Sequence, residues 1–151
     1  MNKPVDEALA LALRYLRAAE RTEAELRAHL TGKGVSEAEV NRVVAAMLAR
    51  RFVSDERVAE REVELAKGAR KVGKEKAKAR LLHRGTPEEV VEKAVAGYEQ
   101  SEEADNALSL LRTKFKPTDD PARAARFLLA RGFGEETVRA ALEQTFPGIE
   151  F

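Results

Sequence analysis

Apolar residues recur at helical spacing along nearly the whole chain, and capping signals interrupt them at regular intervals. The first apolar stripe consists of Val5, Leu9, Ala12, Leu13 and Leu16. A Thr-Glu-Ala-Glu capping box at residues 22–25 starts a second helix, and Gly34 can take the left-handed conformation that ends it. Another capping box, at residues 36–39, starts a third helix. The first third of the chain is therefore predicted to form three helices.

The same succession of three helices is predicted twice more. The second set restarts at Ser54 and continues in a short helix through Leu81. Its last helix is expected to have Thr86 as its cap and Pro87 at its first position, where proline is favoured. The third set begins near residue 101, and its inward positions are Ala104, Ala107, Leu108, Leu111, Phe115, Ala125, Leu128, Leu129, Val138, Ala141, Leu142 and Phe146. About nine helices are expected in total.

A short phrase, in which an apolar residue leads into a glycine and an acid-led helix follows, occurs three times. Its glycines are Gly34, Gly85 and Gly132, which are 85 − 34 = 51 and 132 − 85 = 47 residues apart. This period predicts an all-α, elongated tandem array of three three-helix repeats, at residues 1–52, 53–99 and 100–151. Because a unit of this size buries little surface alone, neighbouring repeats are expected to share their cores.

Composition limits the chemistry that this chain can perform. Apolar residues make up 44% of the 151 residues, which is enough for a core, and cysteine is absent. Disulfides, thiolate nucleophiles and cysteine metal sites are thereby excluded, and a reducing cytoplasm fits. No N-terminal apolar run resembles a signal peptide or a membrane span, so no membrane partner is expected.

Enzymatic motifs are poorly supported by the sequence. His29 and His83 lie in separate repeats without metal-ligand spacing, and most acidic residues fall in first helical turns, where they complement the helix dipole. No glycine-rich loop has the spacing of a nucleotide-binding motif. We therefore expect no catalytic residues, no cofactor and no metal, and a protein that is not an enzyme.

Charge is concentrated in the middle of the chain although the formal net charge is only +1. Residues 1–66 hold 11 basic and 12 acidic residues, residues 67–84 hold 8 and 1, and residues 85–151 hold 8 and 13. The central basic residues are Lys67, Arg70, Lys71, Lys74, Lys76, Lys78, Arg80 and Arg84. Such a run is a candidate footprint for a nucleic-acid backbone or an acidic protein groove, with a merely solvated helix face as the alternative.

Helical geometry places part of this basic run on one face. On a helix that starts near Lys74, the side chains within an arc of about 100° are Lys76, Arg80, His83 and Arg84. Arg57 and Arg61, one turn apart on the preceding helix, could extend the surface, although acidic neighbours could also pair with them. Because no aromatic residue is interleaved, charge-driven contact without base readout is expected.

The ordered combination of these segments resembles the RecX family of bacterial regulators of the RecA recombinase. The matching segments are Ala8-Leu9 to Leu16-Arg17, Arg21 to Arg27, Lys33-Gly34-Val35, Phe52 to Ala59, Lys71 to Gly85, and Arg131-Gly132-Phe133. Together they span almost the whole chain. Two positions depart from the family pattern, because Val58 stands where an aromatic residue is usual and Glu62-Val63 replace the aromatic expected one turn later.

The resemblance implies a fold and a function. The fold is three tandem three-helix repeats, and the function is binding along the groove of the RecA–DNA filament. Such binding would lower recombinase, ATPase and coprotease activity, as part of the control of DNA repair, recombination and the SOS response. The alternative is a non-sequence-specific DNA-binding protein that acts without RecA contact, and a monomer is expected in either case.

Overall fold

The computed structural model describes residues 3–149, and these residues form nine α-helices and no strand. The helices are α1 (Lys3–Ala18), α2 (Glu23–Gly32), α3 (Glu37–Ala49), α4 (Asp55–Lys67), α5 (Lys74–His83), α6 (Glu88–Val95), α7 (Gln100–Lys114), α8 (Pro121–Ala130) and α9 (Glu135–Thr145). The predicted all-α fold is confirmed. No helix in the described part of the chain is long and apolar enough to cross a membrane.

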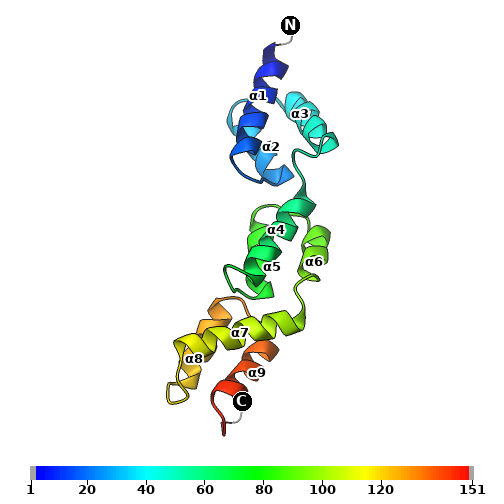
Figure 1. Ribbon diagram of the computed structural model, residues 1–151. Coiled ribbons are helices and arrows are strands. Elements are labelled where there is room, and N and C mark those ends of the chain that lie inside the picture. Colours follow the sequence, from blue (N-terminus) through cyan, green and yellow to red (C-terminus); the bar gives the residue numbers. More distant parts are fainter. Residues whose placement is uncertain (1–2, 150–151) are drawn as a thin grey trace.

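The helices form three groups that follow one another along a single long axis (Figure 1). We call α1–α3, α4–α6 and α7–α9 the first, second and third repeats. Helices α1 and α9 lie at opposite ends of the array (Figure 1). The elongated tandem arrangement predicted from the glycine period is confirmed.

Capping residues explain where several helices begin. Thr22 and Glu25 form the predicted capping box of α2, in which Thr22 accepts a hydrogen bond from the Glu25 N–H and Glu25 accepts one from the Thr22 N–H. The prediction that Thr86 caps α6 is wrong. Pro87 occupies the cap position, and the buried Thr86 hydroxyl has no hydrogen-bond partner among the described residues. Thr86 is instead drawn inward because its N–H bonds the Leu81 carbonyl oxygen at the end of α5.

Each repeat has an apolar core of its own. The first cluster comprises Ala8, Ala12, Leu26, Leu30, Val40, Val43, Val44, Met47 and Val53. The second comprises Val58, Ala59, Val63, Ala66, Val72, Ala77, Leu81, Val91, Val95 and Tyr98. The third comprises Ala107, Leu111, Phe115, Ala124, Leu128, Phe133, Val138, Ala141, Leu142 and Phe146. The expectation that neighbouring repeats share a core is therefore wrong, because the buried apolar residues fall into three separate clusters, one in each repeat.

The repeated phrase is a helix ending. In the second repeat, Gly85 has φ +82° and the Thr86 N–H donates to the Leu81 carbonyl oxygen at 3.1 Å. This is the 6→1 bond of a Schellman motif, and its glycine needs a positive φ that other residues adopt only with strain. The same bond closes the other two copies at 3.1 and 3.2 Å, and their glycines have φ of +85° and +88°.

The surroundings of the three glycines differ although their backbone conformations agree. An added Cβ at Gly34 would meet nothing within 4 Å, whereas one at Gly85 would lie 2.5 Å from the Ala24 Cβ in the first repeat. One at Gly132 would overlap the Cβ and backbone nitrogen of Lys76 in the second repeat. The second and third copies of the phrase are therefore contact points between repeats.

Substituting alanine for these glycines should separate the conformational cost from the packing cost. Gly34→Ala should lower the free energy of unfolding by about 1 kcal/mol, because only the left-handed conformation is strained. Gly132→Ala should lower it by about 2–4 kcal/mol, because the methyl group also collides with α5. Urea denaturation followed by circular dichroism measures both values. Equal losses for the two variants would contradict the packing role of Gly132.

Candidate nucleic-acid interface

Helix α5 connects the second repeat to both neighbours and carries five of the eleven predicted site residues, Lys74, Lys76, Lys78, Arg80 and His83. Its C-terminal end meets the first repeat, where the Thr22 hydroxyl donates to the Arg84 carbonyl oxygen at 2.7 Å. Its N-terminal end meets the third repeat, where the Gly73 N–H donates to the Arg131 carbonyl oxygen at 2.9 Å and the Glu75 N–H to the Gly132 carbonyl oxygen at 3.1 Å. We call these contacts the first joint and the second joint.

The two joints use an arginine in the same way. Arg84 and Arg131 each directly precede a repeat glycine, and each reaches back into the preceding repeat. The Arg84 guanidinium donates to the Glu20 carbonyl oxygen at 2.9 Å, and the Arg131 guanidinium donates to the Lys71 carbonyl oxygen at 3.1 and 3.2 Å and to that of Arg70. Arg84 is thus a structural residue at the first joint, and part of its hydrogen-bonding capacity is used there.

A carboxylate from the following repeat caps the helix at each joint. Asp55 accepts a hydrogen bond from the Glu23 N–H, the first of α2, at 2.9 Å. Glu103 accepts one from the Lys74 N–H, the first of α5, at 2.7 Å. Both acceptors satisfy a donor that a helix N-terminus leaves free, and both complement the helix dipole. The pKa of Asp55 is nevertheless raised, because burial outweighs this hydrogen bond.

An ion pair strengthens the first joint. The Arg84 guanidinium donates to both carboxylate oxygens of Glu25, at 2.9 and 3.0 Å. Burial would raise the pKa of Glu25, but hydrogen bonds from Arg84 and from the Thr22 N–H outweigh it and lower the pKa below its ordinary value of 4.5. Hydrogen bonding to Glu25 in turn raises the pKa of Arg84.

Four of the predicted lysines lie at the second joint and contact the third repeat. Their partners are Glu102 for Lys67 at 3.2 Å, the Ser109 hydroxyl for Lys71 at 3.3 Å, the Gln100 side chain for Lys74 at 3.5 Å, and the Ala130 carbonyl oxygen for Lys76 at 3.3 Å. Among these partners only Glu102 carries a charge. Lys71, Lys74 and Lys76 therefore keep a positive charge that no described carboxylate neutralises by an ion pair.

Two of the predicted arginines, Arg70 and Arg80, lie beside one buried carboxylate, and two more lie close by. The side chain of Glu62 is only 7% exposed, and its oxygen lies 2.8 Å from Arg70 and 3.9 Å from Arg80. Glu62 and Arg70 line a hollow with a volume of about 490 Å³, together with Arg61 and Arg84, and Arg80 lies beside Glu62. We call Arg61, Arg70, Arg80 and Arg84 the arginine cluster. Arg21, which the sequence reading did not single out, lines the hollow as well.

The remaining predicted residues lie outside this cluster. Arg57 pairs with Glu20 at 2.7 Å across the first joint, and Lys78 pairs with Glu92 of α6 at 3.5 Å. His83 is exposed near the end of α5. The structure therefore divides the basic run among two joints, the arginine cluster and an ion pair within the second repeat, whereas the sequence reading expected one cationic face.

The sequence reading missed the carboxylates that pair with the basic run and the role of Arg131. Those carboxylates belong to Glu20, Glu25, Glu92 and Glu102. One signal was available, because an arginine precedes the glycine in the second and third copies of the phrase while Lys33 precedes it in the first. A residue type found only in the copies that follow another repeat is expected at a contact between repeats.

These features define a class of protein, an all-α array of three-helix repeats connected end to end by helix-terminal joints. No group of three histidine, aspartate or glutamate side chains in residues 3–149 is arranged to hold a metal ion. The family model of the first three-helix domain of RecX matches residues 8–46. With the relatives described next, this match shows that the chain belongs to the RecX family.

Relatives of known name and solved structures agree with that assignment. The regulatory protein RecX of Thermus thermophilus is 39% identical over 127 residues, covering 84% of each chain. That of Leptothrix cholodnii is 32% identical over 145 residues, covering 93% of this chain and 90% of the relative. The crystal structure of RecX from Lactobacillus salivarius has a TM-score of 0.86 at 17% identity and covers 96% of this chain and 98% of its own. At that identity the crystal structure supports the fold alone.

The Arg84–Glu25 pair should couple the first two repeats. A double-mutant cycle with Arg84→Met and Glu25→Gln should give a coupling energy of about 1–2 kcal/mol in the free energy of unfolding, because both side chains are mostly shielded from water. Lys33→Met, at the equivalent position of the first repeat, should change that energy by less than about 0.5 kcal/mol. A coupling energy near zero would contradict the role of this pair.

The same pair should make stability depend on pH in a predictable direction. A carboxylate whose pKa is lowered by folding stabilises the protein above pH 4.5, and this stabilisation is lost as the pH falls through its folded-state pKa. The difference in unfolding free energy between the unmodified protein and Glu25→Gln should therefore be largest at pH 6–7 and shrink below about pH 4. A difference that stays constant from pH 7 to pH 3 would exclude the ion pair as its source.

Proposed function

We propose that this protein binds the RecA–DNA filament and lowers the recombinase, ATPase and coprotease activities of RecA, acting as a non-enzymatic regulator of DNA repair, recombination and the SOS response in the cytoplasm. The observation that carries the proposal is membership of the RecX family over most of the chain, since the related proteins are called regulatory proteins. The charge and shape of the molecule support it.

Shape favours a partner that is itself long. Three repeats follow one another along one axis, so the molecule offers a surface that is long in one direction (Figure 1). The joints hold each repeat through backbone atoms as well as side chains, which fixes the orientation of the next. A body of this kind can contact several neighbouring subunits of a filament and oppose the subunit motions that accompany ATP turnover.

Charge favours contact with a nucleic-acid backbone near the second repeat. Four cationic side chains form no ion pair with a described carboxylate, namely Arg61, Lys71, Lys74 and Lys76. Arg80 lies 3.9 Å from the carboxylate of Glu62, which also pairs with Arg70. Such cations can replace the counterions of phosphate groups. The segment from Lys67 to Arg84 has no aromatic side chain for stacking on bases, so the contact would be independent of base sequence.

The alternative function is DNA binding without RecA contact, and the same cationic side chains favour it. Measuring RecA ATPase on single-stranded DNA, with DNA in large excess over both proteins, separates the two. We expect inhibition to persist under DNA excess, because the protein binds the filament. Inhibition that disappears as DNA is added would indicate sequestration of DNA and would contradict the proposal.

Neutralising two members of the arginine cluster should weaken filament binding without removing a contact between repeats. Arg61→Gln combined with Arg80→Gln leaves Arg84 at the first joint and Arg70 beside Glu62. If each lost phosphate contact costs about 0.5–1 kcal/mol, the inhibitory concentration should rise about five- to thirtyfold. Arg42→Gln with Arg139→Gln removes the same charge from exposed positions in the first and third repeats. Equal effects of the two double variants in the ATPase assay would show that the cluster has no specific role.

A further inference from the structure

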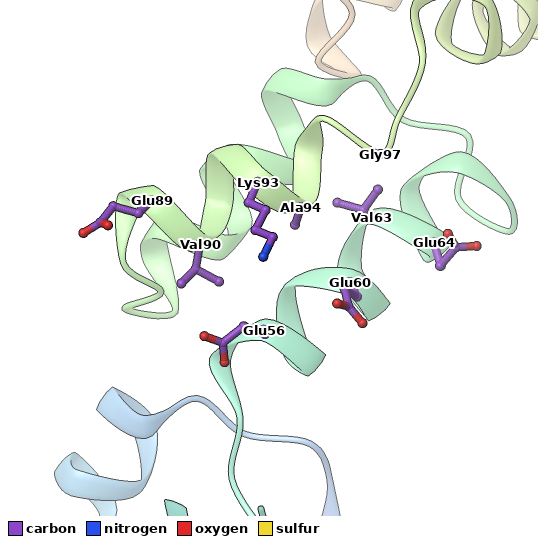
Figure 2. Close-up of a pocket in the computed structure, with 9 residues that line it drawn as sticks. All are labelled: Glu56, Glu60, Val63, Glu64, Glu89, Val90, Lys93, Ala94 and Gly97. Atoms are coloured by element: carbon purple, nitrogen blue, oxygen red, sulfur yellow. The ribbon is translucent and has the colours of Figure 1, made fainter.

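A groove lies between α4 and α6 of the second repeat (Figure 2). Its volume is about 440 Å³. Helix α6 has only 8 residues, whereas the third helices of the other repeats, α3 and α9, have 13 and 11. The short α6 covers part of α4 and leaves the rest of that surface open.

The groove has an apolar floor and an acidic rim. Val63, Val90 and Ala94 belong to the second core cluster or pack against it, and they form the floor. The rim carries the charged residues Glu56, Glu60, Glu64, Glu89 and Lys93, which sum to −4 + 1 = −3. Figure 2 shows three of the carboxylates, those of Glu56, Glu60 and Glu64, on successive turns of α4 beside α6. The lining therefore offers both a surface for an apolar side chain and several acceptors for cationic ones.

Two of the rim carboxylates are available to a partner. No ion pair or side-chain hydrogen bond joins Glu60 or Glu89 to a described residue, whereas Glu64 pairs with Lys67 at 3.5 Å and Glu56 accepts a hydrogen bond from the Ser54 hydroxyl at 3.3 Å. Figure 2 shows Glu60 and Glu89 on opposite sides of the groove. A cationic segment lying along the floor could thus meet a carboxylate on each side.

The charge and the arrangement of the groove carboxylates each argue against one kind of ligand. Four carboxylates repel the phosphates of a nucleic acid, so this face cannot be the one that meets DNA. The carboxylates are also not arranged as a cluster of three that could hold a metal ion, within the described part of the chain. A protein segment that carries lysine or arginine beside an apolar residue matches both the rim and the floor.

We propose that the α4–α6 groove docks a basic, amphipathic segment of the recombinase subunit. One apolar side chain of that segment lies on Val63, Val90 and Ala94, and its lysine or arginine side chains pair with Glu60 and Glu89. This inference rests on the proposed function and adds to it that two surfaces of the second repeat bind different components of the filament. The arginine cluster meets the phosphate backbone, and the acidic groove meets the protein of the same filament.

Charge reversal in the groove tests the proposal. Glu60→Lys with Glu89→Lys should reduce affinity for the assembled RecA–DNA filament at least tenfold, measured by fluorescence anisotropy of the labelled protein. Its affinity for single-stranded DNA alone should be unchanged or higher, because the variant is more positive. Glu136→Lys with Glu143→Lys is the matched control, since it places the same charges on exposed positions in the first and last turns of α9.

The outcomes distinguish the inference from the function on which it rests. If the unmodified protein binds the filament no better than DNA alone, the proposed function and this inference both fail. If it binds the filament and the groove variant loses no more affinity than the control, only the inference fails. Thermal unfolding of both variants verifies that they are folded.

Cross-linking identifies the occupant directly. The chain contains no cysteine, so Ala94→Cys introduces a single attachment site for a benzophenone group at the groove floor. In the filament complex it should cross-link to the recombinase subunit, and Ala140→Cys on the exposed face of α9 should do so at most a few per cent as often. Cross-links from residue 94 that go to DNA, or that are no more frequent than those from residue 140, would overturn the proposal.

Discussion

The contact between a repeat glycine and the N-terminus of a helix in the preceding repeat is the constraint on which this array depends. A helix N-terminus has N–H groups without intrahelical partners, and a helix C-terminus has carbonyl oxygens in the same condition. At the second joint, the Arg131 and Gly132 carbonyl oxygens accept from the Gly73 and Glu75 N–H groups. The two chain segments approach this closely because Gly132 has no side chain. One helix end thus satisfies another, and repeats with separate apolar cores are joined through polar groups.

Within residues 3–149 the first repeat has no repeat before it and the third has none after it, and their sequences differ from the second repeat at the positions that form joints. Gly34 has the turn conformation of the other repeat glycines, yet it faces open space and no arginine precedes it. In the third repeat, α8 begins with Pro121, which has no N–H to offer, and Asp120 caps the helix from within the repeat. The bonds that a downstream carboxylate makes to Glu23 and Lys74 therefore cannot be repeated at α8. Sequence differences among the three copies correspond to differences in what each copy contacts.

The contacts at the joints also determine which positively charged side chains remain available to a ligand. The joints use Arg84, Arg131 and part of the lysine run for contacts between repeats, so fewer cations remain for a ligand than the sequence contains. The arginine cluster around Glu62 remains on one part of the second repeat, while the α4–α6 groove presents carboxylates on another. A repeat with surfaces of opposite sign is suited to a partner made of both nucleic acid and protein, in agreement with a role on a nucleoprotein filament.

Capping boxes, helical periodicity and left-handed glycines act over a few residues, so the amino-acid sequence alone predicts the helices of residues 3–149, their order and the glycine turns between them. It also located the basic run. Only the tertiary structure decided that the cores are separate and which cations stay unpaired, because the partners lie far away along the chain. Glu25 and Arg84 are 59 residues apart, and Lys74 is 29 residues from Glu103. Local rules carry no information about such pairs, since the folding of whole repeats against one another brings them together.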